Sequence, residues 1–352
     1  MNYLYPYCKR INLHVEGRIS TEDAGRQERT AREILSRLSQ QPGIVLADEV
    51  GMGKTFVALA IAVSVALSNR KRRPVVVMVP PSLKEKWPRD FELFREKCLP
   101  DELKVQLKLG RAERAEEFLK FLDDPPERQK SIIFVTHGAM NRGLSDKWVM
   151  LALIQQSLKG RWGADELRRS LSRFAAELLH MWHVEKNGDG IWEELLSKHP
   201  SLWLQVLKDW KIDPEGDNDS HTDDDPVPRS VWTMLSKLNT DAVYESLRTM
   251  PQRRTKHYED HLSEARRGIK QELREVWQKC VRRMKLRLPL LILDEAHHLK
   301  NPETQLASLF QDKEAAQDAD EFSKGPLCGV FERMLFLTAT PFQLGHHELV
   351  RV

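Results

Sequence analysis

The sequence predicts an α/β fold with a mostly parallel sheet, interrupted by a large all-helical insertion. Short apolar runs typical of buried strands alternate with helical patterns over residues 41–140. The stretch 141–287 then shows only helical periodicity and holds eight of the nine tryptophans. The strand pattern returns over residues 288–352, so one α/β domain is expected to be built from two separated parts of the chain.

Each predicted element has a local signal in the sequence. Residues 1–20 show no periodicity, and a helix is expected over 21–39, capped by Ser20 or Thr21, within an N-terminal segment 1–40. Apolar runs predict strands at 44–47, 74–80, 105–109, 131–136, 288–293 and 334–337. Helical patterns lie at 56–67, around Trp87 and over 111–122.

Composition excludes several classes of protein. The 352 residues carry a net charge of only +3, so any case for nucleic-acid binding must rest on local charge. The four cysteines are scattered without a C-x-x-C pair, which indicates neither a disulfide framework nor a zinc site and favours a reducing cytoplasm. No secretory signal is evident, and no apolar stretch is long enough to span a bilayer, so no membrane partner is expected.

A glycine-rich loop stands between the strand at 44–47 and the alanine-rich helix that follows. Strand, glycine loop, Lys-Thr and helix in this order predict a P-loop, in which backbone N–H groups and the helix N-terminus face phosphate oxygens. Lys54 would reach the β- and γ-phosphates of a nucleotide, and the Thr55 hydroxyl would bind Mg²⁺. The alternative is a simple turn with a solvated Lys54. The candidate phosphate-binding residues are Asp48, Glu49, Gly51, Met52, Gly53, Lys54 and Thr55, with Asp48 where the general pattern has glycine.

Two acidic residues follow the strand at 288–293 directly. Carboxylates at the end of a buried strand are unfavourable unless a cation meets them, and in a nucleotide hydrolase that cation is Mg²⁺. Asp294 would hold the metal and Glu295 would orient the attacking water, which makes Lys54, Asp294 and Glu295 the candidate catalytic residues. Two solvated acids at a strand end are the alternative.

A Thr-Ala-Thr-Pro sequence follows the last predicted strand. Thr338 and Thr340 are small hydroxyl residues that would suit a hinge sensing the γ-phosphate and relaying its presence to nucleic-acid contacts. An ordinary Thr-Pro turn is the alternative interpretation.

Together these motifs resemble those of superfamily 2 helicase-like ATPases, and among them the Swi/Snf-type translocases that act on double-stranded DNA. The resemblance covers a RecA-like first lobe at about 20–140 and 288–352 and includes the sequence Asp-Glu-Ala-His-His-Leu-Lys-Asn at 294–301. It implies ATP and Mg²⁺ as cofactors. It implies that Gln27 reads the adenine base, for which a solvated helix glutamine is the alternative. It also implies that His297 couples the nucleotide site to nucleic-acid binding, and that nucleic acid is contacted by Pro80, Thr136 and His137.

The same resemblance implies a second RecA-like lobe that supplies arginine fingers. Only about a dozen residues follow the third motif, so this lobe is expected from a longer chain or from a partner, and the 352 residues alone are expected to hydrolyse ATP slowly. The long helical insertion is expected to mark a subgroup of the family, a bacterial one.

The insertion has two charged segments. Residues 262–287 hold nine Lys or Arg against three Glu, so this helix, with Arg282 and Arg283, could follow a phosphate backbone or could be an ordinary solvated face. Residues 213–226 hold seven acidic residues and predict an exposed or disordered loop. Most tryptophans of the insertion sit among leucines and are expected in the core.

Three functions stay open on these observations. The first is the ATP-binding lobe of a double-stranded DNA translocase. The second is a nucleotide-dependent module that recruits a partner through the helical insertion, and the third is an RNA helicase lobe. Stimulation of ATP hydrolysis by duplex DNA, single strands or RNA would separate the first from the third, and binding without turnover would favour the second.

Overall fold

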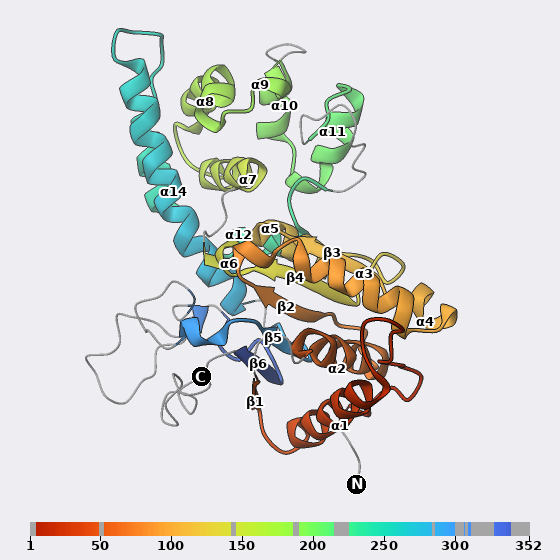
Figure 1. The fold of residues 1–352 in the computed structure, drawn as a ribbon. Coiled ribbons are helices and arrows are strands. Elements are labelled where there is room, and N and C mark those ends of the chain that lie inside the picture. The colour runs from red at the N-terminus through yellow and green to blue at the C-terminus, as the bar shows by residue number, and fades with distance from the viewer. Residues whose placement is uncertain are drawn as a thin grey trace, which may run out of the picture. The chain divides into compact units, whose positions relative to one another are not determined.

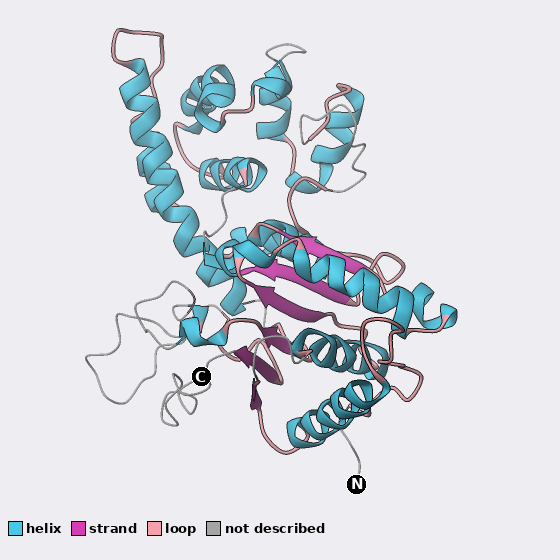
Figure 2. Cartoon of the chain, viewed as in Figure 1, coloured by secondary structure: helices cyan, strands magenta, loops and turns pink. Residues whose placement is uncertain are grey.

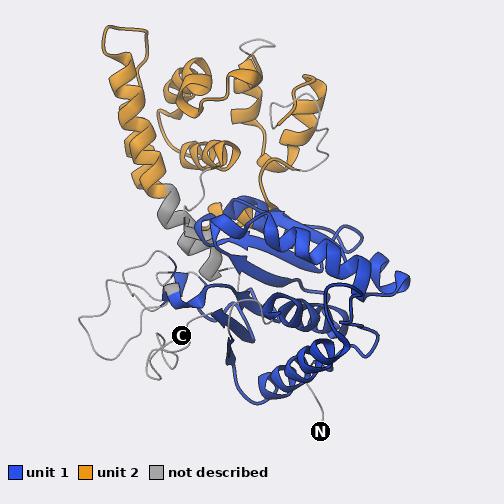
Figure 3. Cartoon of the chain, in the orientation of Figure 1, with its two compact units in different colours: residues 1–141, 285–352 blue, residues 142–284 orange. Residues whose placement is uncertain are grey.

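The computed structural model describes residues 5–48, 53–141, 146–185, 190–214, 225–283, 286–299, 306, 309–310 and 327–338, without the side chains of 140, 141, 273–283 and 298. The chain forms two compact units, residues 1–141 with 285–352 and residues 142–284 (Figure 3). The first is an α/β unit and the described part of the second is all helical, which confirms the predicted fold class (Figure 2). None of the described helices is long and apolar enough to cross a membrane.

The α/β unit is built on a six-stranded sheet in the order β1-β6-β5-β2-β4-β3, in which every paired strand runs parallel (Figure 1). Parallel order follows from the alternation of strands and helices, because each crossover helix returns the chain to the same end of the sheet. The strands are β1 (Gly43–Ala47), β2 (Val75–Val79), β3 (Leu109–Ala112), β4 (Ile132–Thr136), β5 (Leu291–Leu293) and β6 (Met334–Thr338). The helices are α1 (Thr21–Leu38), α2 (Lys54–Ser68), α3 (Lys86–Cys98), α4 (Asp101–Gln106), α5 (Ala115–Asp123) and α6 (His137–Asn141), with 3₁₀ turns at Pro81–Leu83 and Ala296–Leu299.

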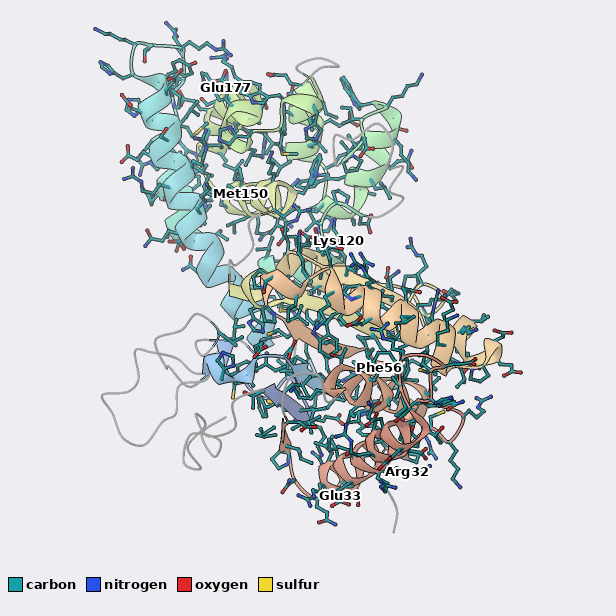
Figure 4. The ribbon with its side chains drawn as sticks, in the orientation of Figure 1. Arg32, Glu33, Phe56, Lys120, Met150 and Glu177 are labelled. Atoms are coloured by element: carbon teal, nitrogen blue, oxygen red, sulfur yellow. The ribbon has the colours of Figure 1, made fainter. Side chains whose placement is uncertain are left out.

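One core lies between the sheet and helices α1, α2 and α3. Alternate residues of the central strands point into it, and α2 is apolar on all sides because it is buried between α1, α3 and the strands. Figure 4 shows Phe56 on α2 with Arg32 and Glu33 on the neighbouring α1. The predicted cap of α1 is Ser20, whose hydroxyl accepts a hydrogen bond from the backbone N–H of Asp23 at 3.1 Å.

One predicted element is wrong and another begins later than predicted. The run 105–109 is not a strand: its first residues end α4, and β3 starts only at Leu109. Leu103 and Leu107 are buried while Val105 is 81% exposed, so the apolar spacing there is the four-residue step of a helix. The helix expected at 111–122 begins instead at Ala115, because Arg111 and its neighbour pair with β4.

The helical unit has its own core. Its helices are α7 (Lys147–Leu158), α8 (Ala164–Leu179), α9 (Trp182–Glu185), α10 (Gly190–Ser197), α11 (Trp203–Asp209), α12 (Arg229–Leu235), α13 (Asp241–Leu247) and α14 (Tyr258–Arg283), with a 3₁₀ turn at Pro200–Leu202. Trp148, Trp192 and Trp203 are buried in this core as expected, whereas Trp162 is fully exposed. Within α14, Arg266 donates to the carbonyl oxygens of residues 177 and 178, so this basic residue stabilises the unit itself. Residues 215–224 of the predicted acidic loop lie outside the described residues.

Candidate active site

The carboxyl edge of the sheet brings the separated sequence motifs together. In the register of the sheet, Ala47 pairs with Thr338, Met78 with Leu293, and Val79 with Thr136. The residues that follow these strands therefore meet along one edge, where open α/β sheets bind ligands.

A cavity of about 550 Å³ opens at this edge. Its walls come from the segment before α1, from α1 itself, from the start of α2, from the start of α3 and from the end of β5. The cavity is large enough for a nucleotide by ordinary ligand-site volumes. Its lining residues are Arg18, Ile19, Asp23, Arg26, Gln27, Gly53, Lys54, Thr55, Phe56, Leu83, Lys86, Trp87, Asp90, Asp294, Glu295 and Leu337.

The described end of the glycine-rich loop has the conformation that phosphate binding requires. Gly53 has φ of 83°, a left-handed conformation that favours glycine, and it caps the N-terminus of α2. Lys54 opens that helix, and its ammonium donates to the carbonyl oxygen of Asp48 at 2.5 Å, across the mouth of the loop. The cation and the helix N-terminus thus point into the same space. Glu49, Gly51 and Met52 lie outside the described residues.

Gln27 is packed directly against the loop. Its side chain is 5% exposed, and in the described part of the chain its Oε1 atom has no hydrogen-bond partner. A Cβ atom added to Gly53 would lie 2.2 Å from Gln27 Nε2, so any side chain at this position would have to displace the Gln27 amide. A buried amide with an unsatisfied acceptor in a cavity wall fits a ligand that offers a hydrogen-bond donor, as an adenine amino group does.

Asp48, which stands where the general pattern has glycine, forms an ion pair with α1. Its carboxylate lies 3.6 Å from Arg26 on α1, which in turn lies 3.8 Å from Asp23. The exposed fractions of the three side chains lie between 32% and 55%, and ion pairs this exposed contribute little to the free energy of folding. The contact instead ties the strand end before the loop to the helix that carries Gln27.

Asp294 is held by groups from two other elements. Its backbone N–H donates to the carbonyl of Met78 at 2.9 Å, and its Oδ2 accepts a hydrogen bond from the indole Nε1 of Trp87 at 2.7 Å. Its Oδ1 accepts from the backbone N–H of Glu295 at 2.9 Å. Burial raises the pKa of the Asp294 carboxyl above its ordinary value, while the two hydrogen bonds to the carboxylate act in the opposite direction.

Glu295 adopts an unfavourable backbone conformation. Its φ is 52°, which costs a residue with a side chain about 1–3 kcal/mol. Its Oε2 lies 3.2 Å from His297 Nδ1. Strained residues concentrate at functional sites, where the surrounding structure enforces them.

Thr55 and Asp294 line the same cavity and offer a hydroxyl and a carboxylate oxygen, the hard ligands that Mg²⁺ prefers. Among the described residues no group of three or more His, Cys, Asp and Glu side chains could hold a metal by itself. A Mg²⁺ ion here would need further ligands from phosphate oxygens and water, which is the usual arrangement for this ion.

The predicted coupling and nucleic-acid residues are distributed along the same edge. Thr338 is buried at the end of β6, and its carbonyl accepts from the backbone N–H of Asp48 at 3.4 Å. Thr136 caps α6 by accepting from the N–H of Ala139 at 3.2 Å, and His137 is largely buried. Pro80 is buried at the end of β2, so only the exposed residues after it reach the surface. Thr340 and the side chains of Arg282 and Arg283 lie outside the described residues.

Sequence reasoning missed two features of the cavity. The Trp87 to Asp294 hydrogen bond joins residues 207 positions apart, and no pattern in either segment indicates it. The guanidinium of Arg18 lies 5.8 Å from the centre of the Phe56 ring, although residues 1–20 carried no recognisable pattern.

Comparison with known proteins adds one match. Residues 26–136 match the family model described as the SNF2-related domain, a segment that runs from α1 to the end of β4. No curated protein matches the chain.

Proposed function

We propose that the chain, whose residues 26–136 match the SNF2-related domain, is the ATP-binding lobe of a motor that moves along double-stranded DNA. SNF2-related domains belong to ATP-dependent hydrolases that generally act on DNA. The choice of duplex DNA, and a second RecA-like lobe in the same polypeptide or in a partner chain, are parts of the proposal.

One observation carries the proposal. Lys54, at the start of α2, and Asp294 with Glu295, after β5, line one cavity although Lys54 and Asp294 lie 240 positions apart in the sequence. A phosphate-binding cation and a carboxylate pair within one cavity are what phosphoryl transfer requires, because that reaction depends on positioning and on charge stabilisation.

Each side chain then has a role set by its location. Lys54 and the first N–H groups of α2 bind the phosphate oxygens, and Gln27 binds the base edge. Thr55 and Asp294 hold Mg²⁺, which when bound neutralises charge on the β- and γ-phosphate oxygens. Glu295 orients the attacking water, and its contact with His297 fixes the direction of that carboxylate. Thr136 and His137 contact the nucleic-acid backbone beside the cavity.

Two substitutions test the nucleotide site. Lys54→Ala removes the phosphate-binding cation and is expected to abolish binding of a fluorescent ATP analogue with Mg²⁺. Glu295→Gln keeps the shape and hydrogen-bonding capacity of the side chain and is expected to retain binding while hydrolysis is lost. Equal affinity of the wild type and Lys54→Ala for the analogue would refute the site.

The choice of nucleic acid is tested by steady-state ATP hydrolysis in the presence of a second RecA-like lobe. Duplex DNA is expected to accelerate hydrolysis more than single-stranded DNA or RNA does. Preferential stimulation by RNA would replace the DNA motor with an RNA helicase, and nucleotide binding without turnover under every condition would favour a nucleotide-dependent recruitment module.

A further inference from the structure

A second hollow lies at the opposite end of the same strands. It is a cavity of about 690 Å³, formed by the residues that precede β2, β3 and β4, whereas the nucleotide cavity lies where strands of this sheet end. We call it the amino-edge groove. Its lining residues are Ala66, Leu67, Ser68, Asn69, Arg70, Arg72, Arg73, Val105, Gln106, Leu107, Lys108, Pro126, Glu127, Gln129, Lys130 and Ser131.

The groove has a strong excess of positive charge. Three turns contribute five cationic side chains to its lining against one carboxylate, that of Glu127, and the five are Arg70, Arg72, Arg73, Lys108 and Lys130. Within the described residues none of the five forms an ion pair with a carboxylate. Arg73 donates to the carbonyl of residue 287 and Lys108 to that of residue 127, while Lys130 lies 5.3 Å from the centre of the Phe121 ring.

The five positive charges of the groove exceed the number needed to offset the partial negative charge at the end of α2. The C-terminus of α2 lies at the groove, and a helix C-terminus is equivalent to about half an elementary negative charge. One cation in the turn after α2 would offset it. The remaining cations have no structural partner of opposite charge among the described residues.

The turn after α2 is also built to hold these cations in place. The Asn69 amide donates to the carbonyl of Arg73 at 2.9 Å and its Oδ1 accepts from the backbone N–H of Lys71 at 3.2 Å. Arg72 has φ of 51°, a left-handed conformation that is unfavourable for arginine. The turn therefore keeps several positive charges close together even though its backbone is strained.

We propose that the amino-edge groove binds the phosphate backbone of duplex DNA, in a contact separate from the one at the nucleotide edge. Arginine guanidinium groups form bidentate hydrogen bonds with phosphate. Because the phosphates of DNA repeat at regular intervals, one duplex can contact cations from all three turns at once. The inference takes its ligand from the proposed DNA-dependent function. It adds a binding surface that no residue of the nucleotide site shares, so the contact is independent of ATP and of DNA sequence.

The test reverses charge in the groove and, as a matched control, elsewhere on the same unit. The groove variant is Arg70→Glu with Lys108→Glu, two exposed side chains. The control variant is Arg29→Glu with Arg37→Glu, two residues of α1 that line neither cavity and give the same change in net charge. Binding of the full 352-residue chain to a fluorescent 30-base-pair duplex is measured by anisotropy, without nucleotide, at several salt concentrations.

The groove variant is expected to bind the duplex more weakly by on the order of tenfold at low salt, and the slope of log affinity against log salt is expected to fall by nearly two, about 0.9 for each lost phosphate contact. The control variant is expected to stay within about twofold of the wild type. Affinity for the fluorescent ATP analogue with Mg²⁺ is measured in parallel and is expected to be unchanged in both.

Three results would overturn the proposal. The wild type could fail to bind the duplex, or both variants could lose affinity equally, which would mean a general effect of net charge. The groove variant could also keep its DNA affinity while losing affinity for a polyglutamate peptide, which would assign the groove to an acidic protein. Because nucleotide affinity is recorded separately, a wild type that binds ATP but not the duplex contradicts this inference and leaves the nucleotide site intact, whereas absence of ATP binding in the wild type contradicts the nucleotide site.

Discussion

Replacing Trp87 by phenylalanine isolates one contact of the candidate metal ligand. Trp87 is 2% exposed, and its indole N–H donates to Asp294 Oδ2 at 2.7 Å. Trp87→Phe keeps an aromatic ring beside Phe134, whose ring centre lies 6.2 Å from that of Trp87, and removes only the donor and part of the ring volume. Asp294 then loses one of the two hydrogen bonds that fix its carboxylate.

The size of the effect follows from the kind of bond. A hydrogen bond to a charged group contributes about 1.5–3 kcal/mol, which corresponds to roughly 10- to 150-fold in an equilibrium constant. If the bond serves to position Asp294 for Mg²⁺, this loss is expected in the Mg²⁺-dependent part of ATP affinity. Binding of ATP in the presence of EDTA is expected to change little, since the donor that is removed contacts Asp294, the candidate metal ligand.

The matched control is Trp192→Phe in the helical unit. Trp192 is also fully buried, but among the described residues its indole N–H has no hydrogen-bond partner. The same atoms are removed there without loss of a bond. The assay is isothermal titration of both variants with ATP, once with Mg²⁺ and once with EDTA. Equal loss of affinity with and without Mg²⁺ in Trp87→Phe would refute the positioning role, as would an equal effect of Trp192→Phe.

Three further substitutions or modifications test other features. Gly53→Ala is expected to destabilise the α/β unit by about 1–2 kcal/mol for the left-handed φ and to displace Gln27; unchanged thermal unfolding and unchanged ATP affinity would contradict the described loop conformation. Gln27→Ala is expected to reduce the preference for ATP over GTP by about 10- to 100-fold in competition titrations, and a preference that persists would exclude base reading by this residue. Burial raises the pKa of the Cys98 thiol from 9.0 to about 11, so at pH 8 it is expected to react with iodoacetamide about a hundredfold more slowly than an ordinary thiol, with the exposed Cys328 as internal reference. Because the unfolded chain releases that proton first, the contribution of Cys98 to stability is complete below about pH 9 and is lost as the pH rises toward about 11, a slope that Cys98→Ala should remove in urea titrations.

The α/β architecture was predictable because its signals are local. A buried parallel strand has to be apolar along its whole length, so β2 and β4 stand out as runs of large aliphatic residues between turns. The carboxylates of Asp294 and Glu295 were recognisable for the same reason, since acids directly after such a run are unusual. The strand predicted at 105–109 was wrong because Val105 and Leu109 share the two-residue alternation of a strand, while Leu103 and Leu107 follow the spacing of a helix, and only burial decides between the two patterns.

The details of the candidate site could not be predicted, because they depend on contacts between distant segments. The Arg26 to Asp48 ion pair and the packing of Gln27 on Gly53 both arise where α1 meets the end of β1, and no pattern in either segment encodes the other. The amino-edge groove was missed for a related reason. By itself the run Arg70 to Arg73 indicates only a solvated loop, and the groove becomes evident only because the fold places Lys108 and Lys130 in the same lining.

The order of the strands has a consequence for how the protein is made. β1 pairs along its whole length with β6, and Gly43 is matched to Met334. Nearly three hundred further residues must therefore be synthesised after β1 before its described neighbour can pair with it. β5, which separates β6 from β2, arrives only after the entire helical unit has been synthesised. The helical unit is one continuous stretch of chain and can fold once it has emerged, whereas the sheet closes late. During that interval the apolar α2 and the open side of β1 are exposed to solvent, which makes the nascent chain a natural client for a chaperone that holds hydrophobic segments.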